Sequence, residues 1–68
     1  MKQRTGISNR EYEVLELIAA GLSNQDIADR LCVSTSTIKT HVSNVLAKLD
    51  ASRRTEAIAK AKELRIIP

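Results

Sequence analysis

The side chains best suited to chemistry in this chain are short hydroxyls and one ammonium group within residues 34–43. If this segment is a helix turning about 100° per residue, Ser36, Thr40 and Ser43 share one side, and Lys39 flanks them. These groups donate and accept hydrogen bonds, and the short serine and threonine stems let a second surface come close. The pattern predicts recognition of a polar partner through one helix face.

Catalysis and metal binding lack the residues that they need. The chain has one cysteine, Cys32, and one histidine, His41, which together cannot supply a zinc site. No carboxylate pair or glycine-rich loop is arranged for chemistry. Cys32 is expected to be a small buried side chain, and His41 to be packed at the core margin or bonded to a phosphate. We expect no enzyme activity, no cofactor and no metal.

Composition predicts one small all-α domain. Sixty-eight residues are near the lower size at which a single core suffices, and low glycine and proline content favours helices. A single cysteine suits a reducing, intracellular setting. No apolar run approaches a membrane span or a signal peptide, so we expect a soluble, cytoplasmic protein without a membrane partner.

Charge is unevenly distributed along the chain. Residues 1–31 hold four basic and five acidic side chains, whereas residues 32–68 hold seven basic and three acidic ones. A basic second half is consistent with a partner that carries phosphates. A solvated, lysine-rich surface would have the same composition, so charge alone does not decide.

Local signals predict where four helices begin. Ser8 with Glu11, and Ser23 with Asp26, have the spacing of capping boxes. These boxes open the first two helices, and a short flexible segment is expected before the first of them, at residues 1–6. The predicted helices cover about residues 9–20, 24–32, 35–49 and 53–65.

The remaining helix boundaries rest on single residues. Ser34 is expected to cap the third helix and Ser52 the fourth. Gly21 is expected to end the first helix in a left-handed conformation, and Asp50 to do the same after the third.

Apolar spacing predicts which faces are buried. The core stripe of the third helix comprises Ile38, Val42, Val45 and Leu49, and that of the fourth comprises Ala57, Ile58, Ala61 and Leu64. A second, weaker stripe on the fourth helix comprises Thr55, Ala59, Lys62 and Ile66. The last three residues, Ile66, Ile67 and Pro68, are expected to form an exposed or loosely docked tail.

The second and third helices, with Val33 in the turn between them, read as a helix-turn-helix. A helix can read bases only if nothing bulky holds it off the major groove of DNA, and the slim face satisfies that condition. Lys39 could donate to guanine N7 or O6, with a contact to a phosphate as the alternative. Thr40 offers a hydroxyl to a base edge and a methyl to thymine.

Several linked motifs occur at spacings that support this interpretation: Ile7-Ser8-x-Arg10-Glu11-x-x-Val14-Leu15, Gly21-Leu22-Ser23-Asn24-x-x-Ile27-Ala28, Ser34-x-x-Thr37-Ile38-Lys39-x-His41-Val42, Lys48-Leu49 and Arg54-Thr55-Glu56-Ala57. With them, residues 7–67 resemble the DNA-binding domain of the LuxR family of bacterial transcription regulators, which includes proteins similar to FixJ, NarL and MalT. The last helix looks most like that of the ATP-dependent, MalT-like group.

The resemblance implies a role for each helix. The third would read bases in the major groove through Lys39, Thr40 and Ser43, and the fourth would pair two subunits through Thr55, Ala59 and Lys62. Phosphate contacts would fall on Ser34, Ser36, Thr37, Asn44, Lys48 and Arg54. RNA polymerase is a further implied partner.

Two departures from the family pattern affect these expectations. Many relatives have Gly-Val where this chain has Asp50-Ala51, so the turn into the last helix can differ. Ser43 is shorter than the lysine of some relatives, so its base contact is water-mediated or absent.

The two arginines that begin the last helix leave alternatives open. A cation opposes the dipole at a helix start, so Arg53 and Arg54 suggest an external anion such as the DNA backbone. A bond to a neighbouring loop carbonyl is the alternative for one of them.

Two other classes of function compete with sequence-specific DNA binding. A protein-binding adaptor would need large apolar residues outside the core stripes, which the third helix lacks. A nonspecific nucleoid or RNA-binding module would need denser lysine and arginine. The sequence does not say whether Met1 starts a stand-alone regulator or a part of a larger one.

Overall fold

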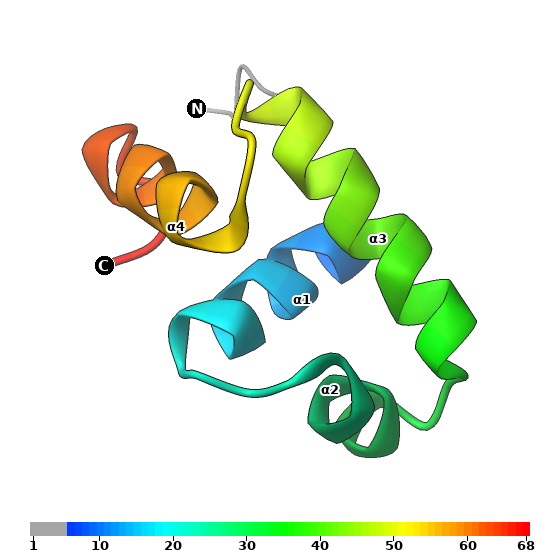
Figure 1. The fold of residues 1–68 in the computed structure, drawn as a ribbon. Coiled ribbons are helices and arrows are strands. Elements are labelled where there is room, and N and C mark those ends of the chain that lie inside the picture. The colour runs from blue at the N-terminus through cyan, green and yellow to red at the C-terminus, as the bar shows by residue number, and fades with distance from the viewer. Residues whose placement is uncertain (1–5) are drawn as a thin grey trace.

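The computed structural model describes residues 6–68 as four helices around a shared core (Figure 1). The helices are α1 (Asn9–Ala19), α2 (Asn24–Leu31), α3 (Thr35–Lys48) and α4 (Arg54–Glu63). In Figure 1, α1 lies in the middle, with α3 along one side, α2 below and α4 on the other side. No strand occurs among residues 6–68, so the all-α prediction is confirmed. The predicted flexible segment, 1–6, lies outside the described residues except for Gly6.

The first two helices begin as their sequences predict. Ser8 Oγ accepts from the Glu11 amide at 3.2 Å, and the Ser8 amide donates to Glu11 Oε1 at 3.0 Å. Ser23 and Asp26 make the same reciprocal pair, at 3.1 and 3.4 Å. Both capping boxes are therefore confirmed, and each satisfies two amides that a helix start leaves without a partner.

The other boundaries are mostly as expected. Ser34 Oγ accepts from the Thr37 amide at 3.2 Å, and Gly21 and Asp50 are left-handed, with φ of 92° and 55°. The prediction for Ser52 was wrong, because Arg53 is the N-cap of α4 and makes no side-chain cap bond. The Ser52 amide instead donates to Glu56 Oε1 at 2.7 Å.

The core consists of two adjoining clusters. In the first, α1, α3 and α4 pack together through Leu15, Val45, Leu49, Ala57 and Ala61. In the second, α1, α2 and α3 pack through Val14, Ile18, Ile27, Ala28, Ile38 and Val42. All four residues of the stripe predicted for α3 are buried. Both clusters contain residues of α3, so the position of this helix depends on the whole core.

The end of the chain differs from its prediction. Leu64, expected in the core, is 55% exposed, whereas Ile67, expected in a loose tail, is only 5% exposed. The helix ends at Glu63, and Arg65 is left-handed, with φ of 61°. The helix therefore ends two residues earlier than predicted, and Ile67, not Leu64, packs into the core cluster of α1, α3 and α4.

Cys32 also differs from its prediction. It is exposed instead of buried, because α2 ends one residue earlier than expected. Cys32 is the C-cap residue, in a left-handed conformation with φ of 60°. The helical spacing that would have turned its thiol toward the core therefore does not apply.

Candidate nucleic-acid interface

The residues predicted to read bases lie together on the solvent-facing side of α3. Lys39, Thr40 and Ser43 are all exposed, as is Ser36 one turn before Thr40. The opposite side of the helix carries Ile38 and the other residues of its buried stripe. Most side chains of the exposed face are short, so another surface can approach the helix backbone closely.

The hydroxyls at the start of α3 already have partners within the protein. Ser34 Oγ, which accepts from the Thr37 amide, also lies 3.0 Å from Thr37 Oγ1, and either hydroxyl can be the donor. One hydroxyl proton of this pair is therefore used internally, which leaves one for an external acceptor. Ser34 and Thr37 together can supply one hydroxyl donor to a phosphate, not two.

Thr40 has a fixed hydrogen bond as well. Its hydroxyl donates to the Ser36 carbonyl oxygen at 3.2 Å. While this bond lasts, the oxygen can only accept from a partner, and the methyl group remains available for apolar contact. Thr40 therefore offers an acceptor and a methyl group to a base edge.

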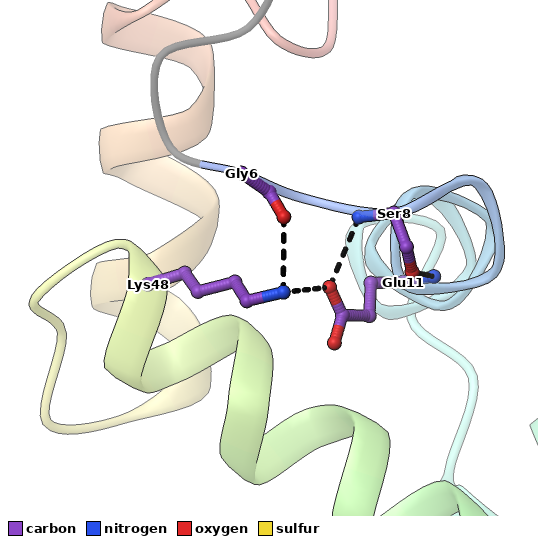
Figure 2. A network of polar contacts seen from close by, with 4 residues as sticks. All are labelled: Gly6, Ser8, Glu11 and Lys48. Atoms are coloured by element: carbon purple, nitrogen blue, oxygen red, sulfur yellow. Dashed lines mark hydrogen bonds and ion pairs between the residues drawn. The ribbon is translucent and has the colours of Figure 1, made fainter.

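Lys48, predicted to bind a phosphate, is bound inside the protein. Figure 2 shows its side chain reaching from the end of α3 to the start of α1. Its Nζ lies 2.6 Å from Glu11 Oε1 and 3.0 Å from the Gly6 carbonyl oxygen. The ion pair is asymmetric, because the Glu11 side chain is 7% exposed and that of Lys48 is 35% exposed. A contact between Lys48 and a phosphate would therefore have to displace this internal ion pair.

Glu11 is ionised in this setting despite its burial. Burial on its own raises the pKa of a carboxyl group. The hydrogen bond from Lys48, the hydrogen bonds to Ser8 and the charge of the ammonium group outweigh it, so the pKa of Glu11 lies below its ordinary value of 4.5. The sequence suggested Glu11 only as a capping residue.

Arg54 also has internal partners. Its Nη1 donates to Asn24 Oδ1 at 2.8 Å, and its Nη2 donates to the Leu22 carbonyl oxygen at 2.9 Å. This is the bond to a loop carbonyl that the sequence left open for one of the two arginines. It ties the start of α4 to the turn between α1 and α2. Arg53 is exposed.

The other predicted contact residues lie on the surface. Ser36 and Asn44 are exposed on α3. On α4, Thr55, Ala59 and Lys62 are exposed, while Ala57 and Ala61 are fully buried on the opposite side. The stripe expected to pair subunits is therefore accessible along one side of α4.

His41 has a feature that sequence reasoning did not find. Its Nδ1 is buried and has no hydrogen-bond partner among residues 6–68. The residue is partly buried, and its packing at the core margin or bonding to a phosphate stays a prediction. Elsewhere in the described part of the chain, no cluster of ligands suits a metal ion, and no helix is both long and apolar enough to cross a membrane.

Comparison with known protein families shows that one family model covers all of the candidate interface on α3. Residues 5–61 match the family described as bacterial regulatory proteins, luxR family. The response regulator protein VraR of Staphylococcus saprophyticus is 45% identical over 71 residues, which cover 98% of this chain and 34% of that protein. VraR of Staphylococcus aureus is 46% identical over 61 residues, covering 90% of this chain and 29% of the relative.

A solved structure shows the same fold. The crystal structure of the response regulator ChrA, from a heme-sensing two-component system, has a TM-score of 0.89 and 41% identity. The match covers 97% of this chain and 33% of that one. The chain thus spans about a third of the length of these relatives. They are response regulators, not members of the ATP-dependent group that the last helix suggested.

Proposed function

This chain belongs to the LuxR family of DNA-binding transcription regulators, and from this premise we propose that it recognises specific double-stranded DNA sequences by placing α3 in the major groove. The observation that carries the proposal is the exposed, slim and polar face of α3 opposite its buried stripe. The function is bacterial transcription regulation in the cytoplasm, without catalysis. Contact with RNA polymerase remains a prediction for activation.

Each group on α3 has a distinct role in this proposal. Lys39 donates to guanine, and Thr40, whose proton is used internally, accepts from a base amino group or packs its methyl against thymine. Ser43 is too short for a strong direct contact and acts through water. Ser34, Ser36, Thr37 and Asn44 hold the phosphate backbone, together with the amides at the start of α3.

Selection of bound duplexes from a random pool tests base reading. The wild-type protein should enrich one motif, and Lys39→Ala should lose the preference at one base pair. Arg10→Ala is the matched control, because it removes one positive charge from an exposed position on α1 and should leave the motif unchanged. An identical motif for Lys39→Ala and wild type would remove Lys39 from base reading. Enrichment of no motif would favour a nonspecific binder.

The stripe of Thr55, Ala59 and Lys62 supports pairing of two copies through α4. Its side chains are small or flexible, so it can bury only a limited area, and a weak dimer is expected. The domain should be monomeric alone and should bind as two copies on half-sites about one DNA turn apart. Sedimentation with and without a two-site duplex tests this, with Ala59→Glu expected to abolish the second copy. A stable dimer without DNA would contradict it.

A further inference from the structure

We propose that Lys48 is a positioning residue that fixes the orientation of α3 against α1, and that it is not a phosphate ligand. This inference rests on the proposed function, because it assigns the residue that holds the DNA-reading helix in place. It replaces the phosphate role that the family resemblance implies for Lys48.

The first argument is the local geometry of the ammonium group. Lys48 Nζ is held by two oxygens, Glu11 Oε1 at 2.6 Å and the Gly6 carbonyl at 3.0 Å. Glu11 Oε1 also accepts from the Ser8 amide at 3.0 Å (Figure 2). Four residues from two separate segments therefore meet at one point.

The second argument is the burial of Glu11. If Lys48 turned toward a phosphate, it would leave a carboxylate that is 7% exposed with only the Ser8 cap as a partner. An uncompensated buried charge is strongly unfavourable. A phosphate at the solvent-exposed rim would have to offset that loss. The ion pair is therefore expected to persist when DNA binds.

The third argument is that a small tilt of α3 at the ion pair produces a larger displacement at Lys39. Lys48 is the last residue of α3 and Glu11 lies in the first turn of α1. Apolar contacts at this end permit rotation about the helix, whereas an ion pair with a second hydrogen bond is directional. At 1.5 Å per residue, Lys39 lies about 13 Å from Lys48 along the axis, so a tilt of roughly 5° would move it by about 1 Å. Such a shift exceeds the tolerance of roughly 0.5 Å for a recognition group.

Glu11→Gln is the sharpest test because two physical effects have opposite signs. Loss of a negative charge should strengthen binding to DNA through the overall field, and it should also release Lys48 for a phosphate. If Lys48 positions α3, the weakened ion pair should instead reduce the affinity for the specific DNA sequence. A loss of about tenfold is expected, which is the usual size of the coupling between two side chains in direct contact. Glu13→Gln is the matched control: it removes the same charge from an exposed side chain of α1 that pairs with Arg10. It should bind as tightly as wild type or slightly tighter.

The salt dependence of binding separates the roles of Lys48 itself. Each phosphate contact contributes about 0.9 to the slope of log K against log salt concentration. Lys48→Met should bind more weakly with the wild-type slope, and Lys48→Arg should restore affinity because a guanidinium can pair with Glu11. Affinities are measured on the selected duplex, at a temperature where circular dichroism shows each variant to be folded.

Each outcome has one meaning. Tighter binding by Glu11→Gln than by the Glu13→Gln control, or a slope about 0.9 shallower for Lys48→Met, would show that Lys48 binds phosphate. Unchanged affinity of the folded Glu11→Gln variant would show a role in stability alone. Either result overturns the inference. Failure of the wild-type protein to prefer the selected duplex over a scrambled one would instead refute the proposed function.

Discussion

Acid should weaken the junction of α1 and α3, and Glu11→Gln should remove that sensitivity. The folded protein holds the pKa of Glu11 below its ordinary value of 4.5, so the ionised form favours folding. A depressed carboxyl pKa contributes stability that is fully present above the unfolded value. That contribution is lost as pH falls from about 4.5 through the folded pKa.

The size of the effect follows from the exposure of the two side chains. Removing one partner of a fully buried ion pair costs about 3–5 kcal/mol. Glu11 is almost fully buried, but the Lys48 side chain is 35% exposed and is therefore partly solvated. We expect the pair to contribute about 1–2 kcal/mol, between the values for buried and surface pairs. A domain of 68 residues has about 3–10 kcal/mol in total.

Urea denaturation followed by circular dichroism measures this difference directly. At about pH 7 Glu11→Gln should be less stable than wild type by about 1–2 kcal/mol, and by about pH 3 the gap should have narrowed or closed. Glu13→Gln controls for the loss of a carboxylate on the same helix. Parallel loss of stability in wild type and Glu11→Gln over this range would refute the reasoning.

Three further predictions test local features of the fold by thermal or chemical denaturation. Ile67→Ala should lower the free energy of unfolding by about 2 kcal/mol or more, because Ile67 is 5% exposed. Leu64→Ala should change it by less than about 0.5 kcal/mol. A larger loss for Leu64→Ala than for Ile67→Ala would contradict the docked C-terminus. Asp50→Gly should stabilise the protein by about 0.5–1 kcal/mol, because Asp50 has φ of 55° and glycine adopts that conformation without strain; lower stability would mean that the Asp50 side chain matters more than its backbone. Ser34→Ala should cost about 1 kcal/mol, and Thr37→Val should add less to it than it costs alone, because the two hydroxyls are bonded to each other; strict additivity would exclude that coupling.

Features decided within a few residues were predictable from the sequence. Both capping boxes and the left-handed Gly21 and Asp50 follow from local chemistry, and all are present. The buried stripe of α3 was predictable because its four apolar residues alternate between separations of four and three residues, which matches one side of a helix. Such signals are strong because no distant part of the chain competes with them.

The errors in predicted burial arose where a helix ends earlier than its apolar pattern. Apolar spacing places Leu64 on the core side only if the helix continues, and the helix ends at Glu63. The left-handed Arg65 then turns Ile67 into the core. The prediction that Cys32 is buried was wrong for the same reason, because α2 ends at Leu31 and Cys32 is its left-handed C-cap. One residue in a left-handed conformation changes which later side chains are buried, and periodicity carries no signal for it.

The partners of the basic side chains could not be predicted either, because they are distant in sequence. Lys48 and Glu11 are 37 positions apart, and Arg54 and Leu22 are 32 apart. For Glu11 and Arg54, the neighbouring residues already suggested a role, so the sequence offered no reason to look for a partner far along the chain. Glu11 completes a capping box, and Arg54 lies at a helix start, where an anion would be expected.

These internal bonds reduce the number of basic side chains that are available to an external phosphate. Lys60 donates to the Asp50 carbonyl oxygen at 2.6 Å, so Lys48, Arg54 and Lys60, three of the seven basic residues after position 31, have partners within the fold. The basic second half therefore overstates the charge available to bind DNA. In the proposed mode of DNA binding, hydroxyls and helix amides would supply more of the contacts to the DNA backbone. Such contacts depend on orientation more than a contact from an ammonium group does. A recognition surface of this kind needs a rigid α3, and the ties at Lys48 and Arg54 hold α3 and α4 in place.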